Sequence, residues 1–107
     1  MKLLTLNCHS WQEENQLEKI KYLAETIYEK DYDVAALQEV SQHRDSNIVY
    51  GNIREDNFAL LLVEELKKLG TDYNFIWDFS HYGYDIYEEG VALLSKQPFN
   101  ESKSFYI

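Results

Sequence analysis

The first forty residues place a stretch of helical periodicity between two short apolar runs. The apolar runs, Leu3–Asn7 and Val34–Gln38, have the length and composition of buried strands. A strand, a helix and a strand in this order usually form a parallel pair with a right-handed crossover. The sequence therefore predicts an α/β fold. The apolar stripe that defines the helix consists of Leu17, Ile20, Leu23, Ala24, Ile27 and Tyr28.

The rest of the chain continues this alternation. Asn15 is a candidate cap for the first helix, and Asp56 or Asn57 for a second helix that ends before Gly70. Further strands are predicted at residues 73–79 and 90–95, with polar loops at residues 41–55 and 80–88. We expect one mixed sheet of about four strands, covered by two helices.

The charge balance limits the classes of partner. Lys and Arg number 10 against 19 Asp and Glu, which gives a formal charge of −9. An acidic chain repels a phosphate backbone, so nucleic acid is a possible but disfavoured partner. The aromatic segment Tyr82–Tyr87 is acidic rather than basic, and it fits a carbohydrate better than a single nucleic-acid strand. An aromatic hairpin packed on itself explains this segment equally well.

The cysteine content and hydropathy suggest a compartment. Cys8 is the only cysteine, which excludes an internal disulfide framework and fits a reducing environment. No segment is apolar for long enough to cross a bilayer, and the N-terminus shows no signal sequence. We therefore expect a cytoplasmic protein without a membrane partner.

Two polar residues follow the first two predicted strands. The run Asp33–Val40 delivers the carboxylate of Glu39 to the rim of a sheet, and Asn7 ends the neighbouring strand. Mg2+ prefers oxygen ligands and keeps several waters, so a carboxylate and an amide at one rim form a candidate metal site, with Mn2+ as a possible substitute. The alternatives are a solvated glutamate that closes a strand and an asparagine that belongs to a turn.

Three motifs occur in a characteristic order: Leu3–Asn7, Asp33–Val40 and Glu88–Ser95. Together they resemble the endonuclease/exonuclease/phosphatase superfamily of Mg-dependent phosphoesterases. The resemblance implies a DNase I-like, four-layer α/β/β/α sandwich. Residues 1–107 would form its N-terminal half, and the C-terminal half would be absent. The nearest candidate for the later Asp-x-Asn motif, Asp72–Asn74, lies too early in the chain and at the start of a probable strand, and we find no Asp-His motif.

The resemblance also assigns roles to residues. Glu39 would bind the metal, and Asn7 would contact the metal and the substrate phosphate. Glu89 would be a catalytic-site residue that orients a histidine located beyond Ile107. Without the resemblance, Glu88 and Glu89 would be interpreted as part of an ordinary acidic loop.

Other candidate residues come from their position near the same rim. His81 could bind phosphate or assist proton transfer, although a single loop histidine is more often structural. His9 and Trp11 could line a sugar-sized, substrate-binding pocket. A zinc site made from Cys8 and histidines lacks ligand spacing, and Cys8 has no evident base for a nucleophilic role.

Among the branches of the superfamily, the residues that make up these motifs are most similar to those of bacterial hydrolases of the maltose 6'-phosphate phosphatase type. This similarity implies hydrolysis of a small sugar phosphate by a longer parent protein, and an isolated chain that is inactive. The alternatives are a DNase-like or abasic-site nuclease and a non-catalytic half-domain.

The predicted strands are apolar on both sides. Val34 and Ala36 project opposite to Ala35 and Leu37, yet two helices can cover only one face of a sheet. The uncovered face would be an association site. We therefore expect the chain to self-associate.

Overall fold

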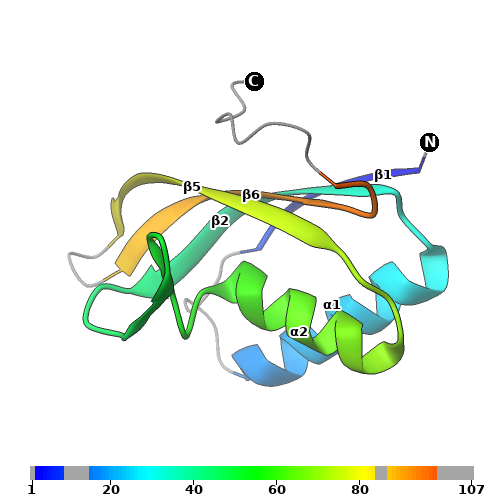
Figure 1. The fold of residues 1–107 in the computed structure, drawn as a ribbon, viewed down its shortest axis with the longest axis horizontal. Helices are drawn as coiled ribbons and strands as arrows, with labels where there is room; N and C mark the ends of the chain where they lie inside the picture. Colours follow the sequence, from blue (N-terminus) through cyan, green and yellow to red (C-terminus); the bar gives the residue numbers. More distant parts are fainter. Residues whose placement is uncertain (1, 9–14, 84–86, 99–107) are drawn as a thin grey trace.

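The computed structural model describes residues 2–8, 15–83 and 87–98. This part of the chain forms six strands and two helices. Figure 1 shows how they are arranged. The elements in chain order are β1 (Leu3–Asn7), α1 (Gln16–Lys30), β2 (Val34–His43), β3 (Ile48–Tyr50), β4 (Ile53–Arg54), α2 (Phe58–Leu69), β5 (Asn74–Gly83) and β6 (Tyr87–Ser95).

One four-stranded sheet dominates the fold, with the order β1-β2-β6-β5. β1 pairs with β2 in parallel, and the two remaining pairs are antiparallel. α1 connects the parallel pair, and both helices lie against the same face of the sheet (Figure 1). β3 and β4 form a separate small hairpin. The predicted mixed α/β fold, with its parallel first pair and its two helices, is confirmed.

The hydrophobic core lies between the two helices and the sheet. Each helix buries a stripe of apolar side chains at helical spacing, as the periodicity predicted. The sheet contributes alternate residues of its strands, because successive side chains point to opposite faces. The fully buried members of the core include Ile20, Ala24, Ile27, Ala35, Leu37, Val40, Phe58, Leu62, Leu66 and Leu94.

The ends of the helices agree with the sequence in α2 and differ in α1. Asn57 accepts hydrogen bonds from the backbone N–H groups of Ala59 and Leu60 at 2.9 and 3.3 Å, and Gly70 closes the helix with φ 103°. Asn15 occupies the N-cap of α1, but its φ is 59° and its side chain makes no capping bond. Asn15 is therefore the N-cap at the predicted position, but without the side-chain hydrogen bond that such a cap usually makes.

Two predicted loops are largely strand. β2 continues to His43 instead of ending at Gln38, and the hairpin of β3 and β4 follows it within residues 41–55. β5 runs to Gly83 and β6 starts at Tyr87, although we predicted a loop at residues 80–88. The polar composition misled the first of these predictions, because Ser41 and Gln42 are buried in the strand rather than exposed in a loop.

β2 contains a bulge at Gln38 and Glu39. Leu37 pairs with Ala92 and Val40 pairs with Gly90, so two residues of β2 oppose a single residue of β6. The bulge changes which residues of β2 face the helices. Ala35 and Leu37 enter the core before the bulge, and Val40 and Gln42 take that side after it.

Gly90 of β6 lies opposite the bulge in a tightly packed position. A Cβ atom there would come 2.0 Å from the carbonyl oxygen of Asp78 and 3.1 Å from the indole ring of Trp77. The same indole donates from Nε1 to the carbonyl oxygen of Val40 at 2.9 Å. Only glycine allows β5 and Trp77 to approach β6 this closely.

Among the described residues, neither helix combines the length and the apolar character that a membrane crossing requires.

Candidate functional site

A row of polar residues crosses the sheet at the level of the bulge. Asn7 follows Leu6, which pairs with Leu37 on the helix side, so Asn7 belongs to the opposite face. Glu89 alternates with the helix-facing Gly90 and also belongs to that face. We define the polar row as Asn7, Glu39, Ser41 and Glu89.

Asn7 and Glu39 meet at one end of the polar row. The Asn7 side-chain amide donates a hydrogen bond from Nδ2 to Oε2 of Glu39. This contact follows from the parallel pairing, which places Asn7 next to Gln38 and the bulged Glu39. The contact is solvent-accessible. The structure thus brings together the two residues that we expected to share a metal site.

The backbone of Glu39 is in a conformation that glycine normally occupies. Its φ is 53°, in the left-handed region, where a side chain costs about 1–2 kcal/mol. The bulge imposes this conformation and directs the side chain toward Asn7. Bulges are common beside active sites, because they re-aim a side chain.

Glu89 is the third residue of β6, whereas we had predicted that it precedes the strand. It is buried, and it pairs with Ser41 of β2 on one side and with the backbone of His81 on the other. Cross-strand partners share a face, so Ser41 is a member of the site that the sequence did not indicate. The bulge hid it, because the strand alternation cannot be followed through an extra residue.

The remaining predicted site residues are less well placed. His81 is part of β5 and not of a loop, and nothing further is described for its side chain. His9 and Trp11 lie outside the described residues. Their assignment to a substrate pocket stays a prediction.

Glu88 is separated from the polar row by the alternation of β6. Its Oε1 accepts hydrogen bonds from Arg54 Nε and Gln42 Nε2, both at 2.8 Å. The hydrogen bond from the Arg54 guanidinium, together with that from Gln42, lowers the pKa of the Glu88 carboxyl below its usual range. The acidic pair is thereby divided: Glu88 is bound into the fold on the helix side, and Glu89 belongs to the polar row.

Cys8 is unsuited to nucleophilic chemistry. The residue is fully buried, and its backbone N–H donates to the carbonyl oxygen of Gln38 at 2.8 Å. Burial raises the pKa of the thiol to about 12, which leaves almost no thiolate at neutral pH. Within residues 2–8, 15–83 and 87–98, no three His, Cys, Asp or Glu side chains gather into a cluster.

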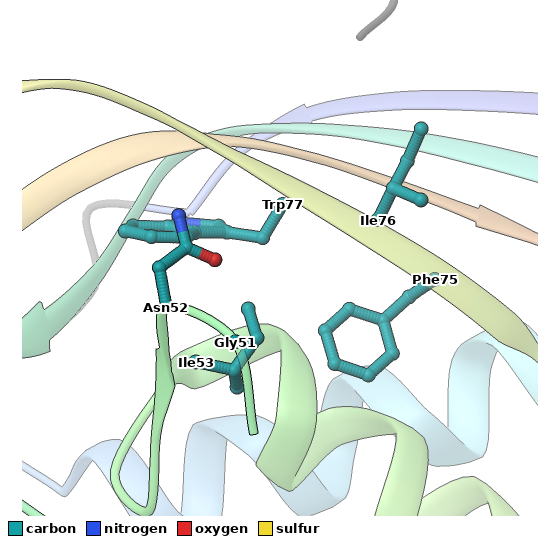
Figure 2. Close-up of a pocket in the computed structure, with 6 residues that line it drawn as sticks. All are labelled: Gly51, Asn52, Ile53, Phe75, Ile76 and Trp77. Carbon is teal, nitrogen blue, oxygen red and sulfur yellow. The ribbon is translucent and has the colours of Figure 1, made fainter. Parts of the chain in front are cut away.

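A pocket of about 250 Å3 lies at the outer edge of β5 (Figure 2). Phe75 and Trp77 line it, and they pair with Leu94 and Ala92, which face the helices. The pocket is therefore on the opposite face of the sheet from the polar row and does not extend the site. Its other lining residues are Gly51, Asn52, Ile53 and Ile76.

Comparisons with known proteins agree on one family. A model of the Endonuclease/Exonuclease/phosphatase family matches residues 4–106. An endonuclease/exonuclease/phosphatase family protein from Leptotrichia buccalis is 49% identical, with a TM-score of 0.91, and the match covers 94% of this chain. An endonuclease/exonuclease/phosphatase from Beutenbergia cavernae, at 18% identity and a TM-score of 0.62 over 94% of the chain, shows the same fold.

Both structures are longer than this chain, which spans 39% of the Leptotrichia protein and 27% of the Beutenbergia protein. A search of curated proteins found no match.

Proposed function

Because the chain belongs to the endonuclease/exonuclease/phosphatase family, we propose that it forms part of a Mg-dependent phosphoester hydrolase. Enzymes of this family are generally hydrolytic and depend on a divalent metal. The observation that carries the proposal is the convergence of Asn7 and Glu39 at the bulge of β2.

The residues at this position fit a hard divalent cation. Glu39 offers a carboxylate and Asn7 an amide oxygen, and both are oxygen donors of the kind that Mg2+ and Mn2+ prefer. Water and substrate oxygens would complete the coordination. The bound ion would stabilise charge on the phosphoryl group.

Three residues of the polar row have distinct roles in the proposal. Glu39 holds the ion, and Asn7 fixes the Glu39 carboxylate and contacts the phosphate. Glu89 is buried in β6 and orients a proton-transfer histidine located beyond Ile107, and His81 stays a separate candidate for proton transfer. A carboxylate beside an imidazole selects its tautomer and stabilises its protonated form.

A small phosphomonoester, such as a sugar phosphate, is the substrate class that the charge favours. The net charge of −9 opposes a nucleic-acid backbone, whereas a compact phosphate needs only the ion and a few contacts. A DNase-like nuclease is the alternative, because both activities occur under the family description. The fully buried single cysteine fits a reducing, cytoplasmic location.

We further propose that the activity belongs to a protein of the relatives' length, since the chain spans only 39% of the Leptotrichia protein. Asn7 and Glu39 supply few ligands by themselves. The isolated chain should therefore bind Mg2+ weakly, with a dissociation constant of about 1 mM or higher, and should not turn over phosphoesters.

Calorimetric titration with Mg2+ tests the site. Glu39→Gln should abolish the weak binding, and Glu25→Gln, which changes an exposed glutamate of α1, should leave it unchanged. Mg2+ affinity that survives Glu39→Gln would refute the metal assignment.

Substrate comparison tests the chemistry. A longer protein that contains this chain should release phosphate from sugar phosphates faster than it cuts plasmid DNA. The opposite ranking would favour the nuclease.

A further inference from the structure

The side chain of Gln42 is completely buried and uses its whole hydrogen-bonding capacity. Its Nε2 donates to the carbonyl oxygen of Asn52 and to Oε1 of Glu88, both at 2.8 Å. Its Oε1 accepts from Arg54 N at 2.8 Å and from Asn57 Nδ2 at 2.9 Å. One amide therefore joins β2, β6, the β3–β4 hairpin and the N-terminus of α2.

Arg54 closes the same network. Its Nε donates to Glu88 at 2.8 Å, and its Nη1 donates to the carbonyl oxygen of Ser46 at 2.7 Å. Glu88 thus receives two donors on one oxygen, from Gln42 and Arg54. The network fixes the Glu88 side chain to both the sheet and the hairpin.

This network lies directly behind the polar row. Gln42 and Glu88 are register partners on the helix side, and the next pair, Ser41 and Glu89, lies on the other face. Glu88 and Glu89 are neighbours in the chain, so a fixed Glu88 side chain limits rotation of the backbone that carries Glu89.

We infer that Gln42 is a positioning residue of the candidate site: through Glu88 it holds β6 so that Glu89 keeps its place in the polar row. The inference rests on the proposed function for its catalytic meaning, but its structural content can be measured on the chain alone. A role limited to anchoring the hairpin would leave β6 unaffected when Gln42 changes.

Three variants separate these roles. Gln42→Glu removes both donated hydrogen bonds and places a second carboxylate against Glu88. The paired exchange Gln42→Glu with Glu88→Gln restores one amide and one carboxylate and keeps a counter-charge for Arg54. Tyr73→Phe is the matched control, because it removes a side-chain hydrogen bond to the Tyr32 carbonyl at the other end of the sheet.

Hydrogen exchange of the 107-residue chain is the readout. In Gln42→Glu, backbone amides of residues 87–91 should exchange at least about tenfold faster than in the wild type, because hydrogen bonds to a charged group are lost. The paired exchange should return most of this protection. Tyr73→Phe should leave these amides unchanged. If Gln42→Glu does not fold, Gln42→Asn, which is neutral but too short to reach every partner, takes its place.

Faster exchange confined to the β3–β4 hairpin, with residues 87–91 unchanged, would overturn the inference, as would a paired exchange that restores no protection. In a longer protein with phosphatase activity, Gln42→Glu should lower kcat more than it raises KM. If the wild type neither binds Mg2+ nor hydrolyses phosphoesters, the proposed function fails, whereas the exchange result still decides the positioning role.

Discussion

The sheet has two halves that meet at the bulge of β2. In the apolar half, Val34–Leu37 and the facing residues 92–95 of β6 put mainly apolar side chains on both faces. In the polar half, Val40–His43 and the facing residues 87–90 put Gln42 and Glu88 on one face and Ser41 and Glu89 on the other. The same strands thus contribute to the hydrophobic core at one end and carry the candidate site at the other. The bulge at Glu39 is the border.

The largest expected effect concerns the face of the apolar half that lies opposite the two helices (Figure 1). Leu3 is 60% exposed, and Val34, Ala36 and Leu93 are only partly covered. We propose that two copies associate through this face with a dissociation constant of about 1 μM, or about 8 kcal/mol.

Sedimentation or light scattering should show a dimer, and Leu93→Lys should weaken it at least about tenfold by burying a charge. Tyr22→Lys, at a 73% exposed position of α1, is the matched control and should not affect association. A monomer at concentrations well above micromolar would contradict the proposal.

The next effect compares the stability of the two halves. Leu94 is fully buried in the apolar half, so Leu94→Ala should lower the free energy of unfolding by about 2–5 kcal/mol. Ser41→Ala in the polar half should cost only about 1 kcal/mol, the usual value of a hydrogen bond. Urea denaturation measures both. Equal losses would mean that the polar half contributes to the core as strongly as the apolar half.

The border itself offers a smaller test. Glu39→Gly and Glu39→Ala both remove the carboxylate, and both should abolish Mg2+ binding. The glycine variant should be more stable than the alanine variant by about 1 kcal/mol, because φ 53° is unstrained only for glycine. Thermal unfolding measures the difference in stability between the two variants. An alanine variant at least as stable as the glycine variant would show that the bulge relaxes.

The smallest effect is a pH dependence of the polar half. Arg54 lowers the folded-state pKa of Glu88, so the stabilisation is complete above the unfolded pKa of about 4.3 and is lost as the pH falls through the folded value. Between about pH 5 and pH 3, the wild type should lose about 1 kcal/mol or less in excess of Glu88→Gln. Urea denaturation at a series of pH values measures the free energy of unfolding of both proteins. If it falls equally with pH in the wild type and in Glu88→Gln, Glu88 makes no such contribution to stability.

The elements that the sequence predicted well depend on local signals. The apolar stripes gave both helices, and Asn57 and Gly70 marked the ends of α2 correctly. The parallel pairing of β1 and β2 followed from the strand-helix-strand order, and it placed Asn7 beside Glu39. These features need only periodicity, turn chemistry and a topological rule.

The features that the sequence missed depend on long-range contacts. Ser41 and Gln42 look like loop residues in the sequence. The polarity of a side chain does not reveal whether its hydrogen-bonding groups bind water or other groups of the protein. Gln42 is buried only because Asn52, Arg54 and Asn57 return to it from the hairpin and α2. The bulge at Glu39 is equally non-local, since it exists relative to the register of β6.

Cys8 gives the molecule a built-in reporter. Its thiol is enclosed where β1 ends, and its carbonyl oxygen accepts from Lys19 Nζ of α1 at 2.5 Å. Since the sequence has no other cysteine, a thiol-reactive reagent added to the native protein can modify only this residue, and only when the segment opens. The modification rate therefore records how often the β1 end of the polar row separates from α1, without any introduced label.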